Sequence, residues 1–318
     1  MQSKDITVIG AAIVDVLAGP VDESSISSGS QPMKTIRMSF GGDALNEAVV
    51  LSRLGKRAGL VTKVGADEAG RRVLDYLREN GLSADTAVVE AGLVTGINIV
   101  LFNESGERSF LTNPQGSLRK LSEKDVEPFL DGAADLVSFA SMFVSPLLDI
   151  PAMGRIFRKI KSKPGRILAV DTTKAKNRES LQDIKDLLPY IDFFFPNEEE
   201  IALLTGEKDP YKNAELLYEA GVSCVAIKRG KLGCLLRYEE GTFHIPACRV
   251  EHCLDTTGAG DGFAAGFLWG ISEGLPPAEC ARFACAAASC SVEKVGAVCG
   301  ITSLQQVRQR YLSAYGKV

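Results

Sequence analysis

A glycine-rich stretch near the C-terminus carries the residues best suited to chemistry. It begins with the polar run 255–257, continues with Gly258, Ala259 and Gly260, and places Asp261 just before an apolar segment of helical periodicity. Small residues let the backbone approach a ligand closely, and the free N–H groups at the start of a helix favour an anion. A carboxylate beside an anion site is what phosphoryl transfer to a hydroxyl requires. The simpler alternative is a tight turn capped by an aspartate.

A second glycine-rich stretch lies much earlier in the chain. Gly41 and Gly42 follow the alternating segment 36–40 and precede a helical run that contains Asp43 and Asn46. Gly42 permits close approach of the backbone, and the Asn46 amide offers both a donor and an acceptor to a hydroxyl group. Taken alone, this stretch predicts only a Gly-Gly turn before a helix.

The N-terminal segment 6–10 is a short apolar run that predicts a buried strand. The segment 10–15 that follows lacks the GxGxxG fingerprint that holds a pyrophosphate, which disfavours a nicotinamide-dependent oxidoreductase. Asp15 ends this segment. In isolation it indicates a surface turn or a helix cap, whereas at a ligand site its carboxylate would accept hydrogen bonds from hydroxyl groups.

Together these stretches resemble the ribokinase-like (PfkB) carbohydrate kinases. The string Asp-Thr-Thr-Gly-Ala-Gly-Asp-Gly-Phe at 255–263 resembles the C-terminal signature of the family, and Gly-Gly-Asp-Ala-Leu-Asn at 41–46 resembles the N-terminal one. The resemblance spans nearly the whole chain and is nearest to uncharacterised bacterial sugar kinases of the family. It implies that Asp261 is the general base and that an anion hole is formed by the amides of Gly258, Ala259 and Gly260.

The same resemblance implies a sugar site made of Asp15, Gly41, Gly42, Asp43, Asn46, Asn98 and Asn113. Asn98 and Asn113 belong to a predicted hairpin over this site, and the alternative is that they are simply solvated. Asp43 departs from the family, in which many members carry a lysine or a small residue. A carboxylate there would repel an acidic or phosphorylated substrate, and the sequence shows no basic cluster beside Asp15 and Asp43. We therefore expect a neutral sugar.

A further group of residues is implied to bind ATP: Asn197, Glu200, Lys228, Gly230, Gly233, Gly258 and Gly260. Glu200 is implied to act indirectly on Mg²⁺. Asn197 follows a buried aromatic run, and its simpler role is to cap a helix whose first turn is acidic. Lys228 ends an apolar strand, where it would counter phosphate as a point charge or remain a solvated strand end.

A monovalent cation, K⁺, is also implied by the resemblance, with Asp255, Thr257 and Gly296 as the residues that help to hold it. Two positions depart from ribokinase. Cys285 stands where an asparagine is common near the adenine, and Gly300 stands where a serine is common beside the cation. These departures concern the adenine contacts and the dependence on a cation.

The order of the predicted elements indicates an α/β fold, in which a mostly parallel sheet carries helices on both faces. Strands are expected near 6–10, 59–65, 136–140, 167–171, 193–195 and 224–228, with helices between them. Residues 92–116 interrupt this alternation with a β-hairpin, 96–102 and 108–112. The resemblance implies one ribokinase-like domain over 1–318, with a small β-sheet lid inserted at about 12–42 and 90–115.

Composition and charge argue against several other classes of protein. The 318 residues are 45% hydrophobic and 24% charged, and the formal net charge of −4 argues against a nucleic-acid partner. No apolar run approaches the ~20 residues of a membrane span. Asp5 and Asp15 interrupt the N-terminal apolar segment, so we expect no signal peptide and predict a cytoplasmic protein. The 8 cysteines form no CxxC pair and only 2 histidines accompany them, which favours buried reduced thiols over a metal site.

The sequence thus predicts an ATP-dependent kinase for a neutral sugar. Kinases for a nucleoside (adenosine-like) or for a 2-keto-3-deoxy sugar acid are alternatives on the same fold. A non-catalytic sugar or nucleotide sensor is an alternative of another class, which loss of the base or of the anion hole would indicate. We also predict a homodimer through the lid, because an open sheet edge and an apolar face seek cover. The apolar residues expected there are Ile97, Ile99, Leu101 and Phe110.

Overall fold

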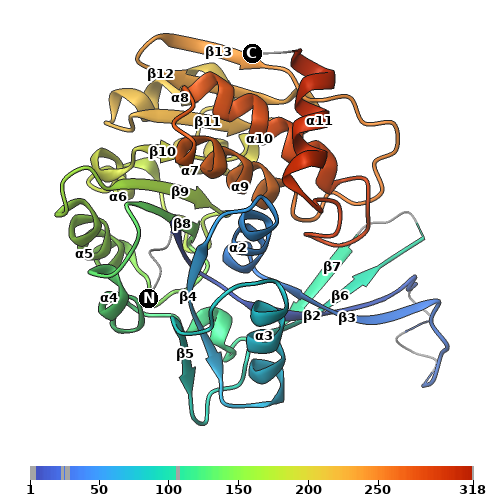
Figure 1. Ribbon diagram of the computed structural model, residues 1–318. Coiled ribbons are helices and arrows are strands. Elements are labelled where there is room, and N and C mark those ends of the chain that lie inside the picture. Colours follow the sequence, from blue (N-terminus) through green and yellow to red (C-terminus); the bar gives the residue numbers. More distant parts are fainter. Residues whose placement is uncertain (1–4, 23–24, 26–28, 105–107, 317–318) are drawn as a thin grey trace.

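The computed structural model describes residues 5–22, 25, 29–104 and 108–316 (Figure 1). A nine-stranded sheet forms its centre, in the order β13-β12-β11-β10-β9-β8-β1-β4-β5. All neighbours from β11 to β5 are parallel, whereas β12 is antiparallel to both β11 and β13. The strands are β1 (Ile6–Ile9), β4 (Ala58–Gly65), β5 (Ala87–Glu90), β8 (Leu136–Met142), β9 (Ile167–Thr172), β10 (Phe193–Phe194), β11 (Cys224–Lys228), β12 (Cys234–Tyr238) and β13 (Gly241–Ile245).

Helices cover both faces of this sheet, as predicted (Figure 1). One face packs against α2 (Asp43–Arg53), α3 (Glu68–Glu79), α9 (Ala259–Ser272), α10 (Pro277–Ser291) and α11 (Leu304–Tyr315). The other packs against α4 (Glu123–Leu130), α5 (Ile150–Lys161), α6 (Leu181–Ile184), α7 (Glu198–Thr205) and α8 (Pro210–Glu219). Three short 3₁₀ helices are η1 (Ser117–Arg119), η2 (Leu188–Tyr190) and η3 (Gly230–Leu232).

Coverage of both faces explains the sequence of the central strands. Every residue of β1 and of β8 is buried. A strand buried on both sides has no solvent face, so it is a continuous apolar run rather than an alternating one. Within the described residues, none of the helices combines the length and the apolar character that crossing a bilayer requires.

A second, four-stranded sheet forms the lid, in the order β3-β2-β6-β7. Its strands are β2 (Ile13–Gly19), β3 (Thr35–Gly41), β6 (Ile97–Phe102) and β7 (Arg108–Thr112). The predicted hairpin is confirmed as β6 and β7, which pair antiparallel. Asp15 lies inside strand β2 of this lid, which excludes the alternative of a surface turn or a helix cap. Residues 13–19 are strand because this short segment pairs with both β3 and β6.

The two faces of the lid sheet differ in polarity. Strand register aligns Asp15 with Ser39 and Asn98, so these polar residues share one face. The opposite face carries apolar residues, namely Val16, Met38, Ile99 and Leu111. Phe110 was expected on the apolar face but pairs with Val100, two residues from Asn98, and therefore lies on the polar face. Leu111 lies on the apolar face where Phe110 was expected, because a shift of one residue along a strand moves the side chain to the other face.

Six cysteines are buried as predicted: Cys224, Cys234, Cys248, Cys280, Cys285 and Cys290. Cys253 and Cys299 are exposed instead, and all eight are free thiols. Both exposed cysteines lie in loops, Cys253 before α9 and Cys299 before α11, whereas the buried ones lie mainly on strands and on helix α10. Cysteine in this chain therefore behaves as a small apolar residue wherever a regular element carries it into the core.

Candidate active site

The two glycine-rich stretches meet where α2 and α9 begin. Asn46, in the first turn of α2, donates a hydrogen bond from Nδ2 to Oδ2 of Asp261 in α9 at 2.7 Å. Gly42, just before α2, has a φ of 97°, and a Cβ atom there would lie 2.5 Å from the carbonyl oxygen of Ala11. Only glycine lets α2 start this close to the end of β1. The structure thus joins the predicted base to the predicted acceptor site.

Asp261 lies in an environment that makes its carboxyl group a stronger base. Desolvation raises the pKa of Asp261 well above the usual range, the negative charge of Asp43 raises it further, and the hydrogen bond from Asn46 opposes the rise. General-base catalysis is most efficient when the pKa of the base lies near the working pH. The surroundings of Asp261 therefore suit proton removal from an alcohol.

The start of α9 presents open backbone N–H groups. Gly258 has a φ of 75°, and a Cβ atom there would lie 2.2 Å from the carbonyl oxygen of Ala297. Within the described chain no side chain caps α9, and the N–H groups of Gly260 and Asp261 have no acceptor. The N–H of Ala259 differs, since it donates to the carbonyl oxygen of Thr256 at 3.2 Å. The open groups favour an anion at this helix end.

The residues predicted to hold a monovalent cation also lie together. Oδ1 of Asp255 accepts a hydrogen bond from the N–H of Thr257 at 2.9 Å, and Oδ2 accepts one from the N–H of Gly296 at 2.8 Å. Asp255 is buried, so its carboxylate ties the loop around Gly296 to the segment that precedes the anion site. A carboxylate with nearby backbone carbonyl groups offers the oxygen donors that K⁺ prefers.

Lys228, the last residue of β11, lies beside the anion site. Its Nζ atom donates to both carboxylate oxygens of Asp171 at 2.7 Å each. A Cβ atom on Gly260 would lie 3.4 Å from the same Nζ atom. The alternative of a solvated strand end is therefore excluded for Lys228. Asp171 was not predicted from the sequence, although a lone carboxylate at the carboxyl end of an apolar parallel strand was a usable signal.

Burial and charge compete within this ion pair. Burial raises the pKa of Asp171 to about 7, and the positive charge of Lys228 opposes that rise. For Lys228, burial lowers the pKa, but attraction to Asp171 and Glu200 outweighs it and leaves the pKa raised. The lysine is therefore cationic at neutral pH. A cation held beside open N–H groups suits a phosphate group.

Asn197 and Glu200 form the cap of α7. Oδ1 of Asn197 accepts from the N–H of Glu200 at 2.8 Å, and Oε2 of Glu200 accepts from the N–H of Asn197 at 2.8 Å. This reciprocal pair is a capping box, so the predicted helix cap is confirmed. Burial also raises the pKa of Glu200, and the positive charge of Lys228 opposes that rise. Both residues line the main cavity described next, so capping and nucleotide binding are compatible.

A main cavity of about 720 Å³ connects these groups, a volume within the range of small-molecule sites. Its polar wall contains Asp43, Asp171, Asn197, Glu200, Lys228, Gly230, Gly233, Gly260 and Asp261. Apolar side chains also line it, among them Val250, Phe263, Cys285, Ala288 and Val292. A cavity that joins charged groups to an apolar wall fits a molecule with a phosphate end and a flat apolar base.

The polar face of the lid forms a separate cluster around Asp15. Asn98 donates from Nδ2 to Oδ1 of Asp15 at 3.1 Å. A Cβ atom on Gly41 would lie 2.1 Å from Oδ2 of Asp15, so glycine leaves room for the carboxylate. Among the described residues, Oδ1 of Asn98 is buried without a hydrogen-bond partner. A buried acceptor of this kind is usually satisfied by a ligand or by water, and a sugar hydroxyl group would satisfy it.

Asn113 has different surroundings. Its Oδ1 accepts from the N–H of Ile97 at 3.1 Å, and its Nδ2 donates to the carbonyl oxygen of Thr95 at 3.3 Å. Both ends of the amide therefore hold the chain at the entrance to β6. Its role as a substrate contact stays a prediction.

Helix α2 also carries two carboxylates toward the site. The Ser141 hydroxyl hydrogen-bonds the Asp43 carboxylate, and the Ser138 hydroxyl donates to Oε2 of Glu47 at 2.7 Å. Glu47 is fully buried, and burial raises its pKa well above the usual range. Glu47 was not among the residues predicted from the sequence. The spacing of Asp43, Asn46 and Glu47 was the available signal, because residues three and four apart share one face of a helix.

Two cationic side chains also lie near Asp43. Desolvation lowers the pKa of Lys176, the charge of Arg119 lowers it further, and the charge of Asp43 opposes this. The three groups are therefore neighbours, although they are far apart in the sequence. The prediction of a neutral acceptor assumed that no basic residues accompany Asp43, and that assumption does not hold.

Known proteins resemble this chain over most of its length. A sequence model described as "pfkB family carbohydrate kinase" matches residues 3–303. A sugar kinase of Archaeoglobus fulgidus is 31% identical over 248 residues, which cover 78% of this chain and 96% of the relative. The 2-dehydro-3-deoxygluconokinase of Bacillus subtilis is 27% identical and covers 90% of each chain. The crystal structure of a Thermotoga maritima ribokinase matches with a TM-score of 0.83 and 26% identity, over 97% of this chain and 99% of that one.

Proposed function

The chain belongs to the pfkB family of carbohydrate kinases, which transfer phosphoryl groups to an alcohol, and from this premise we propose that Asp261 is the general base of an ATP-dependent sugar kinase. The observation that carries the proposal is the hydrogen bond of 2.7 Å between Asn46 and Asp261. It places an amide suited to hydroxyl groups directly on a carboxylate of raised pKa, beside an open helix end.

Each of these groups has one role in the proposed reaction. The acceptor hydroxyl loses its proton to Asp261 as its oxygen bonds to the γ-phosphorus of ATP, and the bond from that phosphorus to the bridging oxygen breaks. Asn46 holds Oδ2 of Asp261, which leaves Oδ1 for the acceptor hydroxyl. The N–H groups of Gly260 and Asp261 and the Lys228 ammonium group stabilise negative charge on the transferred group.

The residues present also fit the ions that the family implies. Glu200 and Asp171 bring carboxylate oxygens to the main cavity, and hard cations such as Mg²⁺ prefer oxygen ligands. When bound with the nucleotide, Mg²⁺ would offset phosphate charge. Asp255, with Thr257 and the loop around Gly296, would hold K⁺.

The class of acceptor is not decided by the family. Relatives of this chain are named as a 2-dehydro-3-deoxygluconokinase, a ribokinase and a cytidine kinase, so the names cover a sugar acid, a neutral sugar and a nucleoside. A non-catalytic sensor is disfavoured, because the candidate base and the open N–H groups of the helix end are both present in this chain.

The replacement Asp261→Asn tests the proposal. It keeps the size of the side chain and removes the base, so turnover should fall by roughly 10²–10⁴-fold while binding of ATP and acceptor is retained. If Asp261 only capped α9, asparagine would serve equally well. ATP consumption is first screened over sugars, nucleosides and sugar acids, and turnover and both affinities are then measured on the variant.

Asp209→Asn is the matched control, because Asp209 caps α8 through the N–H of Tyr211 at 2.9 Å and does not line the main cavity. Near-normal turnover of the Asp261 variant, with correct folding shown by its melting curve, would overturn the mechanism.

We further propose a cytoplasmic homodimer that forms through the apolar face of the lid. This face leaves Ile36, Met38, Ile99 and Leu111 between 42% and 69% exposed, and exposed apolar patches often mark protein interfaces. Sedimentation should show Ile99→Ser as a monomer and Phe110→Ser, on the opposite face, as a dimer. A dimer in both variants would exclude this interface.

A further inference from the structure

A second cavity, called here the side cavity, lies near Asp43 and has a volume of about 240 Å³. Its walls are the segment 143–146 after β8, the start of α5 and the loop 176–179 after β9. Arg119, the last residue of η1, contributes a fourth side. The volume is below that of a typical site for a whole ligand, so it suits one substituent of a molecule rather than a nucleotide.

Two cationic side chains of the side cavity have no acidic partner. Among the residues that the structure describes, the side chains of Arg119 and Lys176 form neither an ion pair nor a hydrogen bond. The Nε atom of Arg119 is buried and is left without an acceptor. A buried charged donor without a partner costs free energy. The side cavity therefore offers a buried guanidinium donor without a partner and an exposed ammonium group, and an anion would pair with both.

These two charges lie close together and close to the acceptor site. Although part of the Lys176 side chain is exposed, desolvation lowers its pKa and the charge of Arg119 lowers it further. The charge of Asp43 acts in the opposite direction on the same lysine. Asp43 also raises the pKa of Asp261, so it is a neighbour of both Lys176 and the base. The side cavity shares Val144 and Ser145 with a small cavity that extends to Ser141, and the Ser141 hydroxyl hydrogen-bonds the Asp43 carboxylate, so the side cavity adjoins the acceptor site.

The acidic residues of the side cavity do not compensate its cations. Oδ1 of Asp149 accepts from the N–H of Ala152 at 2.8 Å, which caps α5. The Glu179 carboxylate accepts from the N–H of Asn177 at 2.9 Å and from its Nδ2 at 3.0 Å. Each carboxylate is therefore used to fix its own loop, and in the described part of the chain neither forms an ion pair with Arg119 or Lys176.

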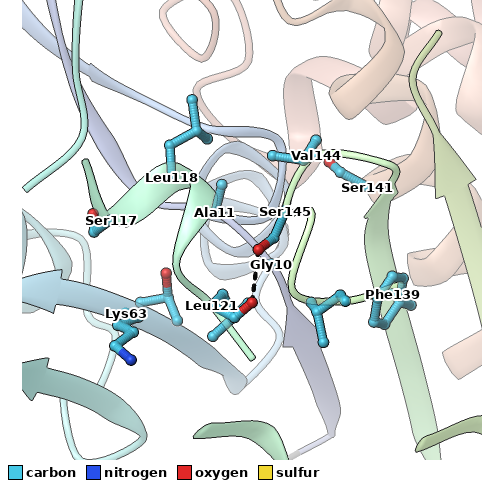
Figure 2. Close-up of a pocket in the computed structure, with 12 residues that line it drawn as sticks. Gly10, Ala11, Lys63, Ser117, Leu118, Leu121, Phe139, Ser141, Val144 and Ser145 are labelled. Carbon is cyan, nitrogen blue, oxygen red and sulfur yellow. Dashed lines mark hydrogen bonds between the residues drawn. The ribbon is translucent and has the colours of Figure 1, made fainter. Parts of the chain in front are cut away.

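The walls of the side cavity are held in place by the chain itself. Figure 2 shows the adjoining region, in which the Ser145 hydroxyl donates to the carbonyl oxygen of Leu121 at 2.7 Å. This bond ties the segment after Arg119 to the loop after β8. The small cavity at the centre of Figure 2 measures only about 10 Å³, which is too small for a substrate group. The space available beside Arg119 is therefore the side cavity.

We propose that the side cavity binds an anionic substituent of the acceptor, a carboxylate or a phosphate, through Arg119 and Lys176. The acceptor is then a sugar acid or a sugar phosphate, with one hydroxyl group at Asp261 and its anionic end in the side cavity. This inference rests on the proposed kinase function. It also assigns a role to Asp43, whose carboxylate accepts hydrogen bonds from hydroxyl groups of the acceptor.

Matched acceptors test the proposal. The anionic probes are D-gluconate, 2-keto-3-deoxy-D-gluconate and D-fructose 6-phosphate, and the neutral probes are D-sorbitol and D-fructose. At least one anionic probe should exceed the neutral ones in kcat/KM by about 10- to 100-fold, because hydrogen bonds between charged groups are the strong ones. Calorimetric titration of the same five probes, with a non-hydrolysable ATP analogue present, gives a readout that does not depend on turnover.

Replacing each of the two cationic side chains tests whether they bind the anionic end of the acceptor. In Arg119→Met and Lys176→Met, KM for the best anionic probe should rise about 10- to 100-fold, while KM for ATP and for the neutral probes stays unchanged. Lys120→Met and Lys174→Met are matched controls, because these lysines adjoin the same segments but do not line the side cavity. The controls should leave every KM within about twofold of the wild type. Part of the Lys176 side chain is exposed, so its replacement tests the proposal even if the Arg119 variant does not fold.

The outcomes separate the two proposals. Tightest binding of a neutral probe, or an unchanged KM in both variants, overturns the anion site and leaves the kinase intact. If none of the probes and none of the compounds in the wider screen supports ATP consumption that depends on Asp261, the proposed function fails instead.

Discussion

The two ends of the site are built in different ways. At the transfer end, Asp261, Lys228 and the open N–H groups come from buried strands and helices, and each side chain already has a partner: Asn46 for Asp261 and Asp171 for Lys228. At the acceptor end, Arg119 lies in the short helix η1, Lys176 in a loop and Asn98 in the lid. In the described chain these three groups lack partners.

This difference separates chemistry from recognition. Groups that stabilise a transition state act best when they are fixed before the substrate arrives, since no reorganisation is then needed during the reaction. Groups that select a substrate gain specificity when they stay unsatisfied with the wrong ligand, because buried polar groups without partners are penalised. We expect replacements at the transfer end to change turnover or ATP binding, and replacements at the acceptor end to change which molecule is used.

After loss of the base itself, the largest effect is expected from Gly258→Ala. The added methyl group would lie 2.2 Å from the carbonyl oxygen of Ala297, and the φ of 75° disfavours alanine, so the start of α9 must move. Turnover should fall by roughly 10²–10³-fold, as when a donor to developing charge is lost. Gly274→Ala is the control, because its φ is 74° but no atom lies within 4 Å of the added methyl group. Equal turnover in the two variants would contradict a role for the helix start.

A smaller effect, confined to the nucleotide, is expected from Lys228→Met. Loss of a charge-assisted contact to phosphate should raise KM for ATP by about 10- to 100-fold and leave KM for the acceptor unchanged. Lys231→Met is the matched control, since Lys231 lines the same cavity but makes no ion pair within the described residues. Steady-state kinetics with each substrate varied in turn distinguish the cases. An equal rise in both KM values would place Lys228 at the acceptor as well.

The smallest expected effect is a shift in pH dependence. The charge of Asp43 raises the pKa of Asp261, and the base acts when deprotonated, so activity is lost as the pH falls through that raised pKa. In Asp43→Asn the pKa of Asp261 falls, so the acid limb of kcat/KM should move to lower pH. Glu199→Gln, at an exposed acid outside the cavity, should leave the limb in place. An unmoved limb in the Asp43 variant would show that Asp261 does not control it.

Local features of the site were determined by the sequence itself. The turn at Gly258, the helix that follows it, the cap formed by Asn197 and Glu200, and the hairpin of β6 and β7 all depend on residues close together in the chain. Backbone geometry, capping and strand alternation act over a few residues, so a short stretch of sequence carries enough information to predict them. The apolar strands likewise determined the α/β class, because only a covered parallel sheet buries such runs on both faces.

Only the tertiary structure decided which distant groups meet. Asn46 and Asp261 are 215 positions apart in the sequence, and Lys228 and Asp171 are 57 apart. In each pair, however, the hydrogen-bonded side-chain atoms are 2.7 Å apart. Arg119 and Lys176 become neighbours because η1 and the loop after β9 both line the side cavity. The face of Phe110 was fixed by strand register, which local patterning does not specify to one residue. Such contacts depend on how elements pack, since no short stretch of sequence contains both partners.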